Sequence, residues 1–106
     1  MEILKFLKEW KKWSKKIATA SKEILGECKV FVFGSIVKEK AVGGSDIDIL
    51  IIHSKLPESR KKRAEIIVKI EEKAGLPLYH PFEIHLVNEE EAKWYFRHID
   101  DFIQIL

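Results

Sequence analysis

The sequence has few of the features that mark membrane or secreted proteins. Its one cysteine, Cys28, cannot form an internal disulfide, so the fold does not depend on an oxidising compartment. No apolar stretch approaches the ~20 residues that are needed to span a bilayer. The N-terminal segment mixes acidic and basic residues within its apolar pattern, unlike a secretory signal. We therefore expect a cytoplasmic protein without a membrane partner.

The sequence also lacks a large excess of either positive or negative charge. The 19 basic and 17 acidic residues give a net charge of +2, which is too even for a protein whose affinity comes mainly from phosphate backbones. We therefore do not expect a nucleic-acid partner. What the 106 residues do contain is a 46% hydrophobic and 34% charged composition, typical of a globular protein. With no repeat or linker, we expect one domain over residues 1–106.

Hydrophobic spacing predicts four helices. Apolar residues recur at intervals of three and four over Ile3–Leu25 and over Arg60–Ala74, and a glycine follows each segment. Asn88 is placed to cap a third helix, whose first turn is acidic. We expect Ile99–Leu106 to form a last short helix.

Three segments are predicted to be strands: Lys29–Phe33, Asp46–Ile52 and Phe82–Val87. The connector of residues 36–45 between the first two strands is too short for a crossover to a parallel neighbour. The predicted fold is therefore α/β in the α+β sense, a small mixed, largely antiparallel sheet flanked by helices.

Two carboxylates begin the most apolar strand. Side chains alternate along a strand, so Asp46 and Asp48 point to the same face, about 7 Å apart. Acids in a covered strand repel each other unless a cation neutralises them, and hard divalent cations such as Mg²⁺ prefer oxygen ligands. The alternative is that both acids lie at a strand end and are solvated.

The third strand has the same anomaly, since Glu83 lies between Phe82 and Ile84. If the two strands are neighbours, three carboxylates can hold two Mg²⁺ ions about 3.5–4 Å apart, as in in-line phosphoryl displacement. Glu83 taken alone can equally be solvated. His85 is on the same face, where it can support a ligand or simply pack.

Gly34 and Ser35 directly follow the first strand. Glycine lets a backbone approach a phosphate closely, and the serine hydroxyl can donate to phosphate oxygens. A Gly-Ser pair alone is more often a simple turn. It has neither the lysine of a Walker A loop nor the three glycines of a dinucleotide fingerprint.

Together these motifs are more specific. The segment FVFGSIVKEKAVGGSDIDILII, residues 31–52, resembles the signature of the DNA polymerase β-like nucleotidyltransferase superfamily. With no second domain after it, the chain resembles a minimal nucleotidyltransferase of the type that is paired with a HEPN-domain protein as antitoxin and toxin. The resemblance implies the nucleotidyltransferase fold, with the order of elements matching to about residue 98.

The resemblance also implies roles for individual residues. Gly34 and Ser35 would cradle the triphosphate, Asp46 and Asp48 would bind both metals, and Glu83 would ligate the metal that activates the attacking hydroxyl and could receive its proton.

Two more positions match the family pattern in part. Lys38 stands where relatives often carry arginine and would contact phosphate as a point charge. Ser45 matches a common family choice and would tie down the loop, although a turn residue fits the position equally well. Glu39 departs from the pattern, because relatives commonly have glycine after the basic position.

The reaction implied is transfer of AMP from ATP to a hydroxyl, with two Mg²⁺ ions as cofactors and release of pyrophosphate. The acceptor implied is a tyrosine of a HEPN partner. A second hypothesis is a catalytically weak subunit that neutralises its partner by contact. A third is transfer to a small molecule or RNA, with the acceptor site completed by a homo-oligomer.

Two segments remain open. The apolar residues of the C-terminal segment can dock on the protein's own core or meet a partner; they are Trp94, Tyr95, Phe96, Ile99, Phe102, Ile103, Ile105 and Leu106. The basic cluster Ser59–Arg63 begins a predicted helix, where it can be solvated or meet a phosphate or an acidic partner.

Overall fold

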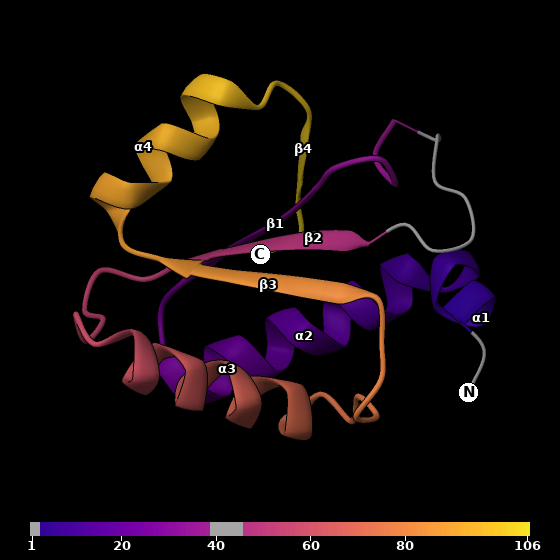
Figure 1. The fold of residues 1–106 in the computed structure, drawn as a ribbon, viewed down its shortest axis with the longest axis horizontal. Helices are drawn as coiled ribbons and strands as arrows, with labels where there is room; N and C mark the ends of the chain where they lie inside the picture. Colours follow the sequence, from indigo (N-terminus) through magenta and orange to yellow (C-terminus); the bar gives the residue numbers. More distant parts are fainter. Residues whose placement is uncertain (1–2, 39–45) are drawn as a thin grey trace.

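The computed structural model describes residues 3–38 and 46–106 and contains one four-stranded sheet with helices on both faces (Figure 1). The elements are α1 (Ile3–Lys8), α2 (Trp10–Leu25), β1 (Lys29–Phe33), β2 (Ile47–Ile52), α3 (Arg60–Lys73), β3 (Phe82–Val87), α4 (Glu89–His98) and β4 (Phe102–Gln104). Within these residues, no helix combines the length and the apolar character needed to cross a membrane.

The strand order is β3-β2-β1-β4. β1 pairs antiparallel with both β2 and β4, while β2 and β3 are parallel. The parallel pair is joined through α3, because parallel neighbours need a long crossover connection. The prediction of a small mixed sheet flanked by helices is confirmed, and β2 is a central strand, as its hydrophobicity indicated.

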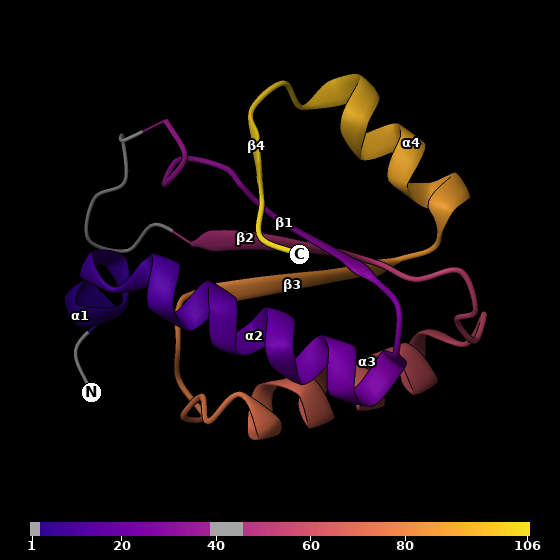
Figure 2. The same cartoon turned by 180° about the vertical axis from the view of Figure 1, so that it is seen from behind.

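Alternation along the strands divides the core into two layers. Ile47, Ile49 and Ile51 of β2 are fully buried in a cluster with residues of α2 and α3. Leu50 and Ile52 belong to a smaller cluster with α4. Figures 1 and 2 show the same division, with α2 and α3 on one face of the sheet and α4 on the other. One strand thus supplies two different surfaces.

The N-terminal helical segment is not the single helix predicted over Ile3–Leu25. It is interrupted at Glu9, where α1 gives way to α2. The break lets Phe6 become fully buried, with its ring centroid 5.1 Å from that of Trp13 and 5.9 Å from that of Phe82. Burial of this aromatic ring outweighs the regular continuation of the helix.

The predicted helix over Ile99–Leu106 is wrong, because Phe102–Gln104 forms strand β4 beside β1. The ring centroid of Phe102 lies 5.3 Å from that of Phe33, and the Val30 N–H donates to the Leu106 carbonyl at 2.9 Å. These contacts occupy the otherwise free edge of β1, and the β-branched residues of the segment favour a strand.

The start of α4 confirms the predicted cap at Asn88. The Asn88 side chain accepts from the Glu91 N–H at 2.8 Å, and the Glu91 carboxylate accepts from the Asn88 N–H at 2.9 Å, which is a capping box. The same carboxylate accepts from the Arg63 guanidinium at 2.6 Å. The pKa of Glu91 is lowered, first by the Asn88 N–H and then by Arg63.

We expect Glu91→Ala to lower the free energy of unfolding at pH 7 by about 1 kcal/mol, a modest loss because this exposed pair is screened by solvent. A carboxylate whose pKa is lower in the folded state stabilises above its unfolded pKa of about 4.3 and loses that contribution as the pH falls through the folded value. Urea unfolding at pH 7 and at pH 3 should therefore show a smaller difference between variant and parent at pH 3.

Glu90→Ala is the matched control, because Glu90 lies in the same helical turn and pairs with the exposed Lys93 rather than with Asn88 or Arg63. An equal effect of the two substitutions, or an undiminished effect of Glu91→Ala at pH 3, would contradict the role given to the capping box and Arg63.

Candidate functional site

The carboxylates of β2 and β3 meet on the face of the sheet that carries α4. Asp48 and Glu83 are Cα partners in the parallel pair of β2 and β3, and each is the second residue of its strand. Oxygens of both side chains and one ring nitrogen of His85 all lie within 4.8 Å of one another. The expectation that acids of two separate strands come together in space is confirmed for this pair.

His85 connects the acids to α4. Its Nε2 lies 3.1 Å from Oδ1 of Asp48, and its Nδ1 lies 3.2 Å from the Tyr95 hydroxyl. The imidazole also packs against Phe33, with ring centroids 5.4 Å apart. The pKa of Tyr95 is raised, mainly by burial and further by the charges of Glu91, Glu83 and Asp48, so the phenol keeps its proton for this contact.

Gly34 lies against the other side of the Asp48 carboxylate. Its φ is +94°, a conformation that favours glycine, and a Cβ added there would collide with Oδ2 of Asp48. The Gly34 carbonyl accepts from the Val37 N–H at 3.2 Å, and the half-buried Ser35 accepts through its carbonyl from the Lys38 N–H at 3.2 Å. The Gly-Ser pair is therefore a tight turn beside the acids.

Two of the remaining predicted residues, Asp46 and Lys38, are not part of this group. Asp46 is exposed and precedes β2 by one residue, so the strand begins later than predicted, and its carboxylate is not among the clustered ligand atoms. Lys38 is exposed, with Nζ 3.8 Å from the Asp101 carboxylate. Ser45 and Glu39 lie outside the described residues.

The donor atoms of the group fit a divalent cation. Two carboxylates and an imidazole are ligands for such ions, and Asp48 is half-buried, with 23% of its side chain exposed. In residues 3–38 and 46–106, neither Asp48 nor Glu83 forms an ion pair with a lysine or arginine. A bound cation would therefore relieve the mutual repulsion of the two carboxylates.

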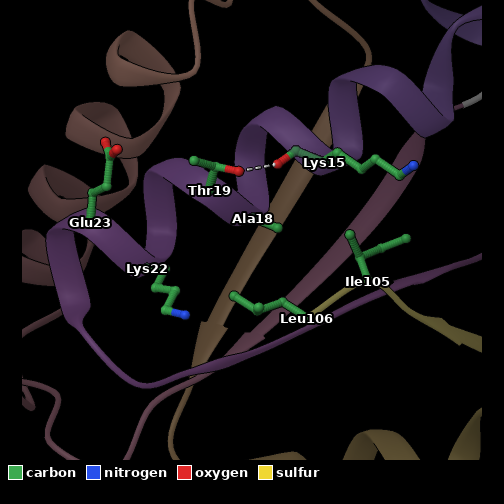
Figure 3. A pocket seen from close by; sticks show the side chains of 7 residues that line it. All are labelled: Lys15, Ala18, Thr19, Lys22, Glu23, Ile105 and Leu106. Carbon is green, nitrogen blue, oxygen red and sulfur yellow. Dashed lines mark hydrogen bonds between the residues drawn. The ribbon is translucent and has the colours of Figure 1, made fainter.

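A pocket elsewhere in the structure lacks such chemistry. It has a volume of about 630 Å³ and lies between α2 and the end of the chain after β4 (Figure 3). Thr19 donates its hydroxyl to the Lys15 carbonyl rather than toward the pocket, and the only acid in the lining is Glu23. The α2 side of the sheet is also the face away from Asp48 and Glu83.

Sequence reasoning missed Tyr95, which was counted only among the apolar residues of the C-terminal segment. The usable signal was spacing, because Tyr95 follows Ala92 by three residues and precedes Ile99 by four, and both neighbours pack in the α4 cluster. A polar-tipped residue in that row had to face the sheet.

Comparisons with known proteins agree with this geometry. The family model of the nucleotidyltransferase domain matches residues 14–103. A crystal structure of a candidate nucleotidyltransferase is similar at 30% identity, covering 85% of this chain and 94% of that one, with a TM-score of 0.66.

A second candidate nucleotidyltransferase, from Sulfolobus solfataricus, is similar in fold alone, at 17% identity and a TM-score of 0.69 over 98% of this chain and 86% of that one. None of the curated proteins matches the chain. The family match spans most of the sequence and includes the Gly-Ser turn and the acids of β2 and β3. The chain belongs to the nucleotidyltransferase domain family.

Proposed function

We propose that this nucleotidyltransferase transfers AMP from ATP to a hydroxyl group and releases pyrophosphate. The observation that carries the proposal is the in-register pairing of Asp48 with Glu83 beside the turn at Gly34. The two carboxylates supply charge for divalent cations, and the turn supplies a backbone that a phosphate can approach.

Asp48 and Glu83 would hold Mg²⁺, with Asp46 adding a carboxylate from the segment just before β2. These carboxylates would hold Mg²⁺ ions, of which we expect two, and the ions would supply the charge that lowers the pKa of the attacking hydroxyl and neutralises the leaving pyrophosphate. Glu83 is exposed, so its carboxylate can receive the proton of an incoming hydroxyl.

The triphosphate would lie along the Gly34-Ser35 turn. The missing side chain of Gly34 leaves room beside Asp48, and the Ser35 hydroxyl would donate to a phosphate oxygen. Lys38 would add a positive charge if its Nζ exchanges the exposed Asp101 carboxylate for phosphate, an exchange between solvent-accessible partners that costs little. Ser45 is proposed to tie down the same loop.

We propose a tyrosine of a HEPN-domain partner as the acceptor. Support comes from the C-terminal part of the chain, where Trp94 is 56% exposed, Phe96 45% and Ile103 38%. Aromatic side chains of this kind are enriched at protein interfaces. The same exposed side chains also support the alternative, a subunit that neutralises its partner by contact and transfers little AMP.

The test uses ATP labelled at the α-phosphate, Mg²⁺, the protein and a HEPN-domain protein encoded beside it. We expect the label on a tyrosine of the partner, at a rate at least about 10³-fold above a reaction without the enzyme. ATP labelled at the γ-phosphate is the control and should leave no label on protein, because the γ-phosphate departs with pyrophosphate.

Label from the γ-phosphate would indicate phosphorylation instead and contradict the proposal. Label found only on RNA or on a metabolite would reject the protein acceptor. An Asp46→Asn, Asp48→Asn double variant then separates catalysis from contact: neutralisation that survives without AMP transfer shows that contact is the mechanism.

A further inference from the structure

His85 places a nitrogen among the carboxylate oxygens of the site. Its Nε2 is 3.1 Å from Oδ1 of Asp48, and His85, Asp48 and Glu83 each offer one ligand atom, all within 4.8 Å of one another. Neighbouring ligands of an octahedral ion with bonds of about 2.1 Å are about 3.0 Å apart. The separation between His85 and Asp48 therefore suits a shared cation as well as a hydrogen bond.

The other ring nitrogen, Nδ1, contacts the Tyr95 hydroxyl, which can pair with it both with and without a metal on Nε2. Without a metal, the Nε2–H can donate to Asp48 while Nδ1 accepts from the Tyr95 hydroxyl at 3.2 Å. An imidazole that ligates through Nε2 carries its hydrogen on Nδ1 and needs an acceptor there. The Tyr95 hydroxyl is both a donor and an acceptor, so it fits either tautomer.

The plane of the imidazole is fixed from two sides. The ring centroid lies 5.4 Å from that of Phe33 on β1 and 5.5 Å from that of Tyr95 on α4. His85 itself is on β3, paired in register with Leu50 of the central strand. A ring held in this way presents Nε2 at one position, which favours coordination over a mobile surface role.

We propose that His85 is a nitrogen ligand of the divalent cation at this site and that Tyr95 orients it. Mn²⁺ also takes oxygen ligands, but as a first-row transition ion it accepts an imidazole nitrogen more readily than Mg²⁺ does, so His85 raises the preference of the site for Mn²⁺ over Mg²⁺. This inference rests on the proposed function, because it assigns a ligand and a metal preference to the same site.

The direct test is pulsed electron paramagnetic resonance on the protein with Mn²⁺ and inorganic triphosphate, which contains no nitrogen. We expect nuclear modulation from a directly bound ¹⁴N, and its replacement by the ¹⁵N pattern when the protein is made with ¹⁵N-labelled histidine. This measurement needs no substitution. Bound Mn²⁺ without histidine-nitrogen coupling would overturn the proposal.

Substitutions test the metal preference. His85→Gln should weaken Mn²⁺ binding by about 10-fold or more and Mg²⁺ binding much less, so that the ratio of the two affinities falls by about 10-fold. Glutamine still offers an N–H to Asp48. If His85 only supported Asp48 through a hydrogen bond, both affinities would stay the same or change by the same factor, and either outcome would overturn the proposal.

Two variants complete the set. Tyr95→Phe should lower the Mn²⁺ affinity several-fold while retaining the nitrogen coupling, because the ring stays and only the partner of Nδ1 is lost. His98→Gln is the matched control. His98 is an exposed histidine of α4 whose Nδ1 contacts the Trp94 carbonyl and whose ring stacks on the Trp94 indole. It should change neither affinity, and a loss of nitrogen coupling in His98→Gln would place the ligand elsewhere and overturn the proposal.

The result also separates this inference from the proposed function. Mn²⁺ binding and AMP transfer without nitrogen coupling would refute the role of His85 alone. Absence of any divalent cation binding, together with absence of AMP transfer, would refute both.

Discussion

Replacing Asp48 by asparagine should lower the rate of AMP transfer by about 10³-fold or more. The variant would bind the metal more weakly, and the transition state would lose several kcal/mol of electrostatic stabilisation. The asparagine has nearly the same shape and can still accept the hydrogen bond from His85, 3.1 Å away in the parent protein. It also removes the repulsion from Glu83. The melting temperature should therefore stay the same or rise.

The measurement is label transfer from α-labelled ATP, alongside thermal unfolding of the same preparation. Asp100→Asn is the matched control, since Asp100 is exposed and lies in the segment after α4. A retained transfer rate in Asp48→Asn, or an equal loss in Asp100→Asn, would show that the pair of acids on β2 and β3 does not carry the reaction.

Gly34→Ala should both destabilise the protein and abolish transfer. A non-glycine residue at a φ of +94° costs about 1–2 kcal/mol, and the added Cβ would collide with the Asp48 carboxylate. We expect the free energy of unfolding to fall by more than about 2 kcal/mol, with a loss of activity comparable to that of Asp48→Asn, because the carboxylate must move.

Gly75→Ala separates the backbone cost of a side chain at positive φ from the cost of the collision with Asp48. Gly75 also has a positive φ, of +79°, but nothing lies within 4 Å of a Cβ placed there. It should therefore show the backbone cost of about 1–2 kcal/mol without loss of AMP transfer. Urea unfolding of both variants gives the comparison. Equal destabilisation with retained activity in Gly34→Ala would mean that the carboxylate does not depend on this glycine.

β1, β2 and β3 could be predicted from local sequence, because β-branched and aromatic residues favour strands and Phe82–Val87 also alternates between apolar and polar side chains. Lys29–Phe33 and Phe82–Val87 have the bounds that the sequence indicated. The cap at Asn88 was predictable for a similar reason, since a capping box is formed by residues three apart. In each case the structure is determined by near neighbours along the chain.

The two wrong secondary-structure predictions fall in segments whose conformation depends on contacts with residues distant in the sequence. The break at Glu9 depends on Phe6 reaching Phe82, and β4 depends on the free edge of β1 and on the Phe33 ring. A helical period in the first segment and a short apolar tail in the last carry no information on these partners. Tertiary contacts therefore overrode the local preference.

The site was predictable in part for the same reason. The alternation of Asp48, Glu83 and His85 fixed a common face, but only the register between two strands brings them together. The contact of His85 with Tyr95 required knowing that α4 folds back over that face. Asp46 followed the alternation rule in the sequence, yet β2 begins after it, so the rule does not place its side chain.

The division of β2 between two surfaces has a practical consequence for engineering. Its odd-numbered positions, Ile47, Ile49 and Ile51, are buried under α2 and α3, while Asp48 at an even position lies with Glu83 and His85 on the opposite face. Of the even-numbered positions, Leu50 and Ile52 are themselves buried in the smaller cluster with α4, so Asp48 is the position of β2 that belongs to neither core layer. A combinatorial library at Asp48 and at its neighbours Glu83 and His85 on β3 can therefore vary the polar group on this face while the buried residues of β2 are kept unchanged.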